Sequence, residues 1–379
     1  MSSLKTSLHR RDAIKRFAAA GAALALPAFA QPARIVLGQS AAFSGPAEQL
    51  GLQMNQGARI YFDALNATGG VNGRTIELRT LDDGYEPERC KANTDKLIKD
   101  DVFALFGYVG TPTCMAAMPL VDAAKIPFFG PFTGAEALRD PFRKTVFHVR
   151  ASYDDETALI VKQLTSLGIR KIAVFHQNDA YGQAGLSGVL SALKPIGLAP
   201  VAIGTVERNS VNVSKAVKDI VAAQPAAVIQ VGAYKACAAF IREARKAGYG
   251  GTFFNVSFVG TQALADELGK EARGVVISQV MPSPFSTSTA ISREYVEAVR
   301  KAGGDAKPNY SSMEGYVAAK VFAEGLKRAG KPATRDSLIA GPESMQNTDF
   351  GGFHVDFSAR DHKASDYVVL SMLTEDGKV

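Results

Sequence analysis

The chain has 379 residues, 46% of them hydrophobic and 21% charged, with a formal net charge of +6. This composition is typical of a soluble globular protein. The length excludes a single ordinary hydrophobic core and suits two lobes of about 150 residues each. Apart from the N-terminal segment, no apolar run reaches the roughly 18 residues that a membrane-spanning helix needs.

The N-terminal segment has the layout of an export signal. Arg10 and Arg11 belong to a basic region, residues 17–26 form an apolar core, and residues 28–30 have the sequence Ala-Phe-Ala of a cleavage site. The paired arginines favour the twin-arginine route, with a Sec signal or a retained anchor as alternatives. We expect export to a bacterial periplasm, with cleavage near Ala30 that removes residues 1–30.

Removal of this signal changes the net charge of the chain. Residues 1–30 contain five Lys/Arg and one Asp, so the +4 that they carry leaves +2 of the total +6. The exported chain has no concentrated basic block, and we therefore expect no nucleic-acid partner.

The three cysteines are too few for a disulfide framework, and none has metal-ligand spacing, so we expect no metal. An oxidising compartment permits one bridge. Cys90 and Cys114 lie near the starts of successive predicted helices, which leaves a bond between them or two buried free thiols as alternatives.

The first block of the chain alternates strands and helices. Apolar residues in the helix at 53–70, for example, recur at positions i, i+3, i+4 and i+7. The expected order is a strand at 33–40, a helix at 53–70, a strand at 74–83, a helix at 88–101, a strand at 102–107, a helix at 115–124 and a strand at 126–134.

The pattern restarts near residue 153. The expected order is a helix at 154–168, a strand at 171–177, a helix at 182–197, a strand at 200–206, a helix at 213–224, a strand at 226–232, a helix at 237–251 and a strand at 252–257. Residues 281–290, with two prolines and several hydroxyls, predict a crossover. A long helical stretch at 312–330 and an apolar strand at 367–373 follow.

This alternation predicts an α/β protein with two Rossmann-like lobes, each a mostly parallel sheet flanked by helices. We expect three crossovers, near residues 151–154, near 279–282 and before the C-terminal strand. The first lobe then comprises 31–152 plus 283–366, and the second lobe comprises 153–282 plus 367–379.

Three strand ends of the first block carry hydroxyl side chains next to a helix start, at Ser44, Thr111 and Thr133. In open parallel sheets, ligands bind outside the carboxyl ends of the strands, where helix N-termini attract anions. Thr111 occupies an expected N-cap position before Pro112, so it could hold a carboxylate or only cap its own helix.

Thr133 has the same two interpretations. The sequence Thr-Gly-Ala-Glu at 133–136 predicts a capping box, although a capping threonine can still present its amide to a ligand. Pro131 and Phe132 precede it in the same corner. Because the two threonine corners follow successive strands, we expect them to lie side by side.

Aromatic residues follow the strands of the second block, at Tyr181, Tyr234 and Phe258. An aromatic wall that faces an anion-binding corner suits a small ligand with one acidic and one apolar end. The alternative is that these rings only pack the ends of their strands.

The export signal, the two-block alternation and the strings GYVGTPT, GPFTGAEALR, VFHVRASYDDE and NDAYGQAG resemble type I periplasmic solute-binding proteins. Specifically, they are similar to the leucine/isoleucine/valine-binding family, which delivers ligands to ATP-driven importers. The resemblance implies that residues at the positions of Thr111 and Thr133 hold a ligand carboxylate. It also implies that tyrosines matching Tyr181 and Tyr234 close over the ligand from the other lobe.

One position departs from that family's pattern. Amino-acid binders of the family have an acidic residue, which pairs with the ligand ammonium, where this chain has Ser257. A buried ammonium without a carboxylate partner is costly. Either another acid substitutes, or the ligand is an aromatic or aliphatic carboxylate without an amino group.

Catalytic motifs are not found in the sequence. The five histidines lack H-x-x-x-H spacing, and G-x-S-x-G does not occur. We therefore expect no enzyme and no cofactor. The expected partners are a small carboxylate ligand and the membrane permease of an ABC importer, with the receptor a monomer; a ligand sensor for a signalling partner and an extracytoplasmic enzyme are the other candidates.

Overall fold

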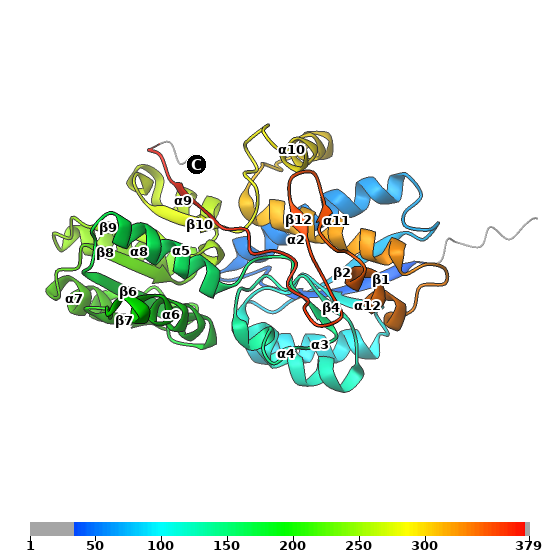
Figure 1. The fold of residues 1–379 in the computed structure, drawn as a ribbon, viewed down its shortest axis with the longest axis horizontal. Coiled ribbons are helices and arrows are strands. Elements are labelled where there is room, and N and C mark those ends of the chain that lie inside the picture. The colour runs from blue at the N-terminus through cyan, green and yellow to red at the C-terminus, as the bar shows by residue number, and fades with distance from the viewer. Residues whose placement is uncertain (1–33, 376–379) are drawn as a thin grey trace, which may run out of the picture. The chain divides into compact units, whose positions relative to one another are not determined.

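The computed structural model describes residues 34–375, so the predicted export signal lies outside the described residues. Two main sheets carry the fold (Figure 1). The first has the strand order β2-β1-β3-β4-β5 and is parallel throughout. Its strands are β1 (Ile35–Ala41), β2 (Ile76–Asp82), β3 (Ala104–Phe106), β4 (Phe128–Phe129) and β5 (Val146–Phe147).

The second sheet has the order β13-β10-β9-β8-β6-β7. Only the C-terminal strand β13 is antiparallel within it, paired with β10. Its strands are β6 (Ile172–Gln177), β7 (Ile203–Val206), β8 (Ala227–Val231), β9 (Thr252–Asn255), β10 (Val276–Gln279) and β13 (Val369–Met372). A small antiparallel pair, β11 (Thr348–Asp349) and β12 (His354–Val355), completes the strands of the described part.

Each sheet belongs to one lobe. The helices of the first lobe are α2 (Glu48–Ala67), α3 (Pro87–Lys99), α4 (Thr111–Ala124), α10 (Ala290–Ala302), α11 (Tyr310–Arg328) and α12 (Arg335–Glu343). Those of the second are α5 (Tyr153–Ser166), α6 (Ala180–Leu193), α7 (Ser214–Ala222), α8 (Tyr234–Lys246) and α9 (Thr261–Leu268). The chain passes between the sheets three times, after β5, after β10 and before β13.

Helices cover both faces of the first sheet. Because adjacent residues of a strand point to opposite faces, neighbouring residues contact different helix layers. Leu105 and Phe128 belong to one apolar cluster with the inward faces of α3 and α4. Their neighbours Phe106 and Phe129 instead contact Phe322 of α11. The sheet is thus a middle layer between α3 and α4 on one side and α2 and α11 on the other (Figure 1).

The predicted fold class of two parallel-dominated α/β lobes is confirmed. The predicted list of elements was incomplete, since α9, α10, α12, β5, β10, β11 and β12 were not predicted. Within residues 34–375, no helix combines the length and apolar character that crossing a membrane requires.

Candidate functional site

Thr111 and Thr133 lie in direct contact. Their hydroxyl oxygens are 2.6 Å apart, and both side chains are buried. Thr111 follows β3 and Thr133 follows β4, neighbouring strands of the first sheet, so the parallel register brings the two corners together. We call these residues the threonine pair.

Neither threonine caps a helix with its side chain. Helix α4 begins at Thr111 itself, and its N-cap is Gly110, so the N-cap expectation for Thr111 is wrong by one residue. The capping box predicted at 133–136 is also wrong, because the short helix Glu136–Leu138 starts after Ala135 and lacks a side-chain cap. Both hydroxyls are therefore directed to the pair rather than to helix ends.

An aromatic cluster surrounds Phe258 of the second lobe. The Phe258 ring centroid lies 4.7 Å from that of Tyr181, 5.4 Å from Phe132 and 6.1 Å from Tyr85. Tyr181 in turn lies 5.4 Å from Tyr153. We call these five residues the aromatic cluster; it joins rings of both lobes beside the threonine pair.

Tyr153, at the start of α5, is a buried member of the aromatic cluster whose hydroxyl has no hydrogen-bond partner in the described part of the chain. Burial raises the pKa of Tyr153 to about 12, while Arg150 and the Thr133 hydroxyl act in the opposite direction. The phenol therefore stays protonated at neutral pH and can donate a hydrogen bond.

The remaining predicted site residues lie in different places. Tyr234 is the buried first residue of α8, and its hydroxyl faces the backbone of Gln49 in α2. The carbonyl of Pro131 accepts a 2.9 Å hydrogen bond from the Thr133 amide. Ser44 is exposed and donates to the Asp82 carboxylate over 2.6 Å, so the structure does not bring Ser44 to the threonine pair.

Ser257 is part of a buried polar network. Its amide and hydroxyl donate to the two carboxylate oxygens of Glu156, at 2.7 Å and 3.0 Å. The guanidinium of Arg150 donates from Nη2 to the Ser257 hydroxyl and, over 3.1 Å, to Glu156. Arg150 Nη1 also lies 3.5 Å from Glu314. Arg150, Glu156, Ser257 and Glu314 are called the Arg150 network below.

Burial and neighbouring charges set the ionisation of this network. Burial raises the pKa of Glu314 to about 7, although Arg150 opposes the change. Burial also lowers the pKa of Arg150, but the Glu314 and Glu156 carboxylates outweigh this effect and hold it above its usual value. Arg150 therefore remains a cation at the centre of the protein.

Sequence reasoning missed Arg150, Tyr153, Glu156 and Tyr85. Arg150 and Tyr153 lie in the crossover that leads into α5, within a string quoted for the family resemblance but not assigned a role. A lone arginine among the apolar residues of VFHVRAS was the available signal, because a buried charge requires partners. Tyr85 lies in the loop between β2 and α3 and gave no such signal.

A rim contact joins the loop before α3 to the loop after β7. Arg208 donates to Glu86 over 3.1 Å, and Asn209 donates to the Gly84 carbonyl over 3.1 Å and to Glu86 over 2.7 Å. These residues belong to different lobes, so we define the rim contact as Gly84, Glu86, Arg208 and Asn209.

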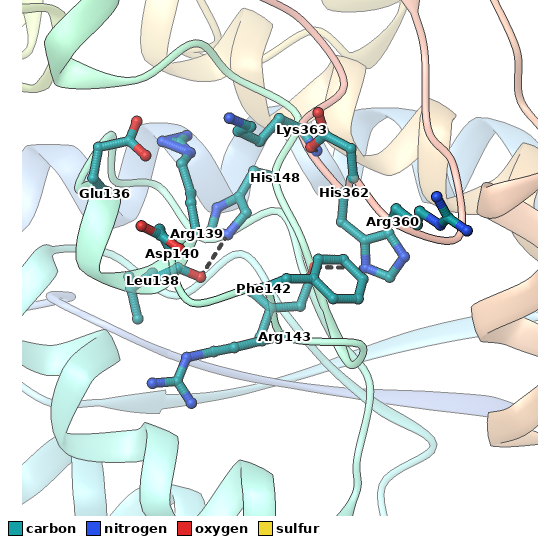
Figure 2. A pocket seen from close by; sticks show the side chains of 12 residues that line it. Glu136, Leu138, Arg139, Asp140, Phe142, Arg143, His148, Arg360, His362 and Lys363 are labelled. Carbon is teal, nitrogen blue, oxygen red and sulfur yellow. Dashed lines mark hydrogen bonds between the residues drawn. The ribbon is translucent and has the colours of Figure 1, made fainter.

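A separate hollow of about 330 Å³ is lined by residues from the segments 136–148 and 360–363 (Figure 2). In it, His148 Nε2 donates to the Leu138 carbonyl over 3.1 Å, and the His362 ring lies 3.2 Å from Glu343. Arg143 pairs with Asp122 at 2.6 Å. Arg139 also lines the hollow, and its Nε and Nη1 have no hydrogen-bond partner in the described part of the chain.

Neither a metal site nor a disulfide is found in the described part of the chain. No group of three His, Cys, Asp or Glu residues within 34–375 is arranged to hold a metal ion. Cys90, Cys114 and Cys237 are buried free thiols, which decides between the two alternatives for Cys90 and Cys114.

Comparisons with known proteins agree with this architecture. The periplasmic binding protein family model matches residues 34–378. A possible leucine/isoleucine/valine-binding protein from Rhodopirellula baltica SH 1 is 36% identical, with a TM-score of 0.86 over 91% of this chain and 95% of that chain. A substrate-binding periplasmic protein from Ralstonia solanacearum is 33% identical, with a TM-score of 0.86 over 90% and 98%.

A curated relative extends the same result. The Leu/Ile/Val-binding protein homolog 7 of Brucella abortus (strain 2308) is 27% identical, over 94% of this chain and 93% of its own length. The chain belongs to the type I periplasmic solute-binding proteins of the leucine/isoleucine/valine-binding family.

Proposed function

We propose that this protein is the periplasmic receptor of an ABC importer and binds a small carboxylate-bearing solute, a branched-chain or other apolar amino acid being the first candidate. The ligand would bind between a lobe of residues 31–152 plus 283–366 and a lobe of residues 153–282 plus 367–379. The observation that carries this proposal is the buried threonine pair, 2.6 Å apart, at the entrance of α4. The export signal predicted for residues 1–30 is consistent with the location that the family implies.

The threonine pair suits a carboxylate for a simple hydrogen-bonding reason. One hydroxyl donates to the other, and Thr133 also accepts from the Ala135 amide over 3.3 Å, so one hydroxyl proton is left to donate. The first turn of α4 adds backbone N–H groups that have no acceptor within the helix. Hydrogen bonds to a charged acceptor are stronger than neutral ones, so a carboxylate is favoured here.

The second lobe would complete the site on closure. Phe258 contacts the first-lobe rings of Tyr85 and Phe132, Tyr181 packs against Phe258, and Tyr234 faces Gln49 of α2. A ligand that touches both lobes binds the closed state better than the open state and therefore shifts the equilibrium toward closure. The permease would then distinguish the closed receptor from the open one.

Replacing Thr111 by valine tests this proposal. Loss of a hydroxyl contact to a charged group should cost about 1.5–3 kcal/mol, or roughly ten- to a hundredfold in affinity, in isothermal titration calorimetry. Thr113→Val is the matched control, because its hydroxyl donates to the Gly110 carbonyl over 2.9 Å within the same helix. An unchanged affinity of Thr111→Val would remove the role assigned to the threonine pair.

A further inference from the structure

We infer that the site selects carboxylates that carry no α-ammonium group and that Arg150 sets this selectivity. The inference rests on the proposed function and, among the carboxylate-bearing solutes considered there, replaces the amino acids by apolar monocarboxylates as the first candidates. It is carried by the Arg150 network, which lies between the lobes and holds Ser257 of the second lobe against Arg150.

Arg150 places a buried cation beside the aromatic cluster. Its side chain is fully buried, and the guanidinium carbon lies 5.2 Å from the ring centroid of Phe132, the residue directly before Thr133. It also lies 5.8 Å from the ring of Tyr153. Nε and Nη1 have no hydrogen-bond acceptor in the protein, although Nη1 is at ion-pair distance from Glu314. Two buried donors therefore remain for an anionic ligand.

The carboxylate that could neutralise a ligand ammonium is already occupied. Glu156 accepts from Arg150, from the amide and hydroxyl of Ser257, and from the hydroxyl of Ser278. These four donors use the acceptor positions of both carboxylate oxygens. Glu314, the other acid of the network, faces Arg150. An α-ammonium next to Arg150 would meet a like charge and find the acceptor positions of Glu156 filled, while burial raises the pKa of Glu314 to about 7, so that this carboxyl is only partly ionised at neutral pH.

The other end of the ligand meets an apolar surface. Phe132, which directly precedes Thr133, contacts Arg150 and Phe258, and Phe258 in turn contacts Tyr181. Rings of this kind bind an aromatic or branched aliphatic body and offer no compensation for a charge on the adjacent carbon. A carboxylate attached to an uncharged apolar chain therefore suits the threonine pair, the Arg150 network and the aromatic cluster together.

Calorimetry with matched ligand pairs tests the inference on the purified protein. L-Phenylalanine and 3-phenylpropanoate differ only in the α-ammonium, as do L-leucine and 4-methylpentanoate. We expect the compound without the ammonium to bind at least tenfold more tightly in at least one pair. Equal or tighter binding of the amino acids would overturn this inference and leave the receptor proposal standing, whereas no binding of any of the four would count against both.

Variants of Arg150 test its assigned role. Arg150→Gln should reduce the preference within a pair about tenfold or more, while Arg150→Lys, which keeps the charge, should retain most of it. Arg143→Gln is the control, since Arg143 pairs with Asp122 outside the network. The ratio of affinities is the readout, because a general loss of stability lowers both affinities without changing their ratio. An unchanged ratio in a folded Arg150→Gln protein would exclude Arg150 as the selective residue.

Discussion

Gly110 holds the entrance of α4 in a backbone conformation that side chains rarely adopt. Its φ is 101°, in the left-handed region, and a Cβ there would lie 2.2 Å from the Tyr85 ring. Gly69, at the end of α2, has the same φ of 101°, but a Cβ there would meet nothing within 4 Å. The two glycines thus share a conformational requirement and differ in the close approach of an aromatic ring.

Alanine at each position separates these two effects. Gly69→Ala should cost about 1–2 kcal/mol of unfolding free energy from backbone conformation alone. Gly110→Ala should cost about 1–3 kcal/mol more, since Tyr85 must also move. Urea unfolding measures both values. Equal losses of unfolding free energy in the two variants would mean that Tyr85 moves without an energetic cost and that Gly110 is required only for its φ.

Among the residues of the candidate site, those that directly follow regular strands were predicted from the sequence, whereas those at the crossover were not. Thr111 and Thr133 were expected side by side because parallel strands end at one edge of a sheet. Arg150 and Tyr153 lie at the crossover between the lobes. The path of this crossover depends on how the two lobes pack, and sequence periodicity does not predict that packing. The hydrogen bond from Ser44 to Asp82 was likewise not predictable, because it joins the ends of two strands across a loop.

Helices α2 and α11 pack backbone against backbone. A Cβ on Gly57 of α2 would lie 1.8 Å from the Ser312 carbonyl oxygen, and a Cβ on Gly315 of α11 would lie 2.1 Å from that of Met54. Glycine at these positions therefore lets the two helices approach closely. The closely packed pair forms the helix layer on one face of the first sheet.

Alanine in place of these glycines should destabilise the protein, against the usual trend for helices. A Gly→Ala change inside a helix ordinarily gains roughly 0.5–1 kcal/mol. Here Gly57→Ala and Gly315→Ala should each cost at least about 1–3 kcal/mol, because rigid backbone must shift. The double variant should cost less than the sum, since helices separated by the first methyl accommodate the second. Thermal unfolding checks this, and a stabilising single change would contradict it.

Element prediction from the sequence depended on length and periodicity. The helix expected at 312–330 corresponds to α11, and the alternating strands and helices of both blocks are present. Strand β5 has only two residues, too few to show a period of two. Helix α10 did carry a signal, because Ile291, Tyr295 and Val299 recur on one face and are buried.

On the scale of the whole molecule, the rim contact links the two lobes at the edge of the site. The Arg208 and Glu86 side chains are 25% and 42% exposed, so their ion pair is partly screened by solvent. Such pairs contribute about 0.2–1 kcal/mol. Because the two partners lie on different lobes, separation of the lobes would remove this small contribution.

Arg208→Ala should therefore weaken ligand binding about two- to fivefold, by lowering the stability of the closed state. The effect should shrink at high salt, which screens exposed charges. Arg300→Ala is the control, because Arg300 pairs with Glu297 inside the same helix α10. Its loss should therefore leave ligand affinity unchanged. Calorimetry of the tightest-binding carboxylate at low and high salt gives the comparison, and a salt-independent loss would exclude an electrostatic role for Arg208.

The burial of all three cysteines has a practical consequence. Burial raises the pKa of the Cys90, Cys114 and Cys237 thiols, so at neutral pH they present little thiolate to an alkylating dye. The chain also contains no tryptophan to compete as a fluorophore. A single Glu88→Cys change, at an exposed position in the first turn of α3 beside Glu86, would accept one label and turn the receptor into an optical reporter of its own ligand.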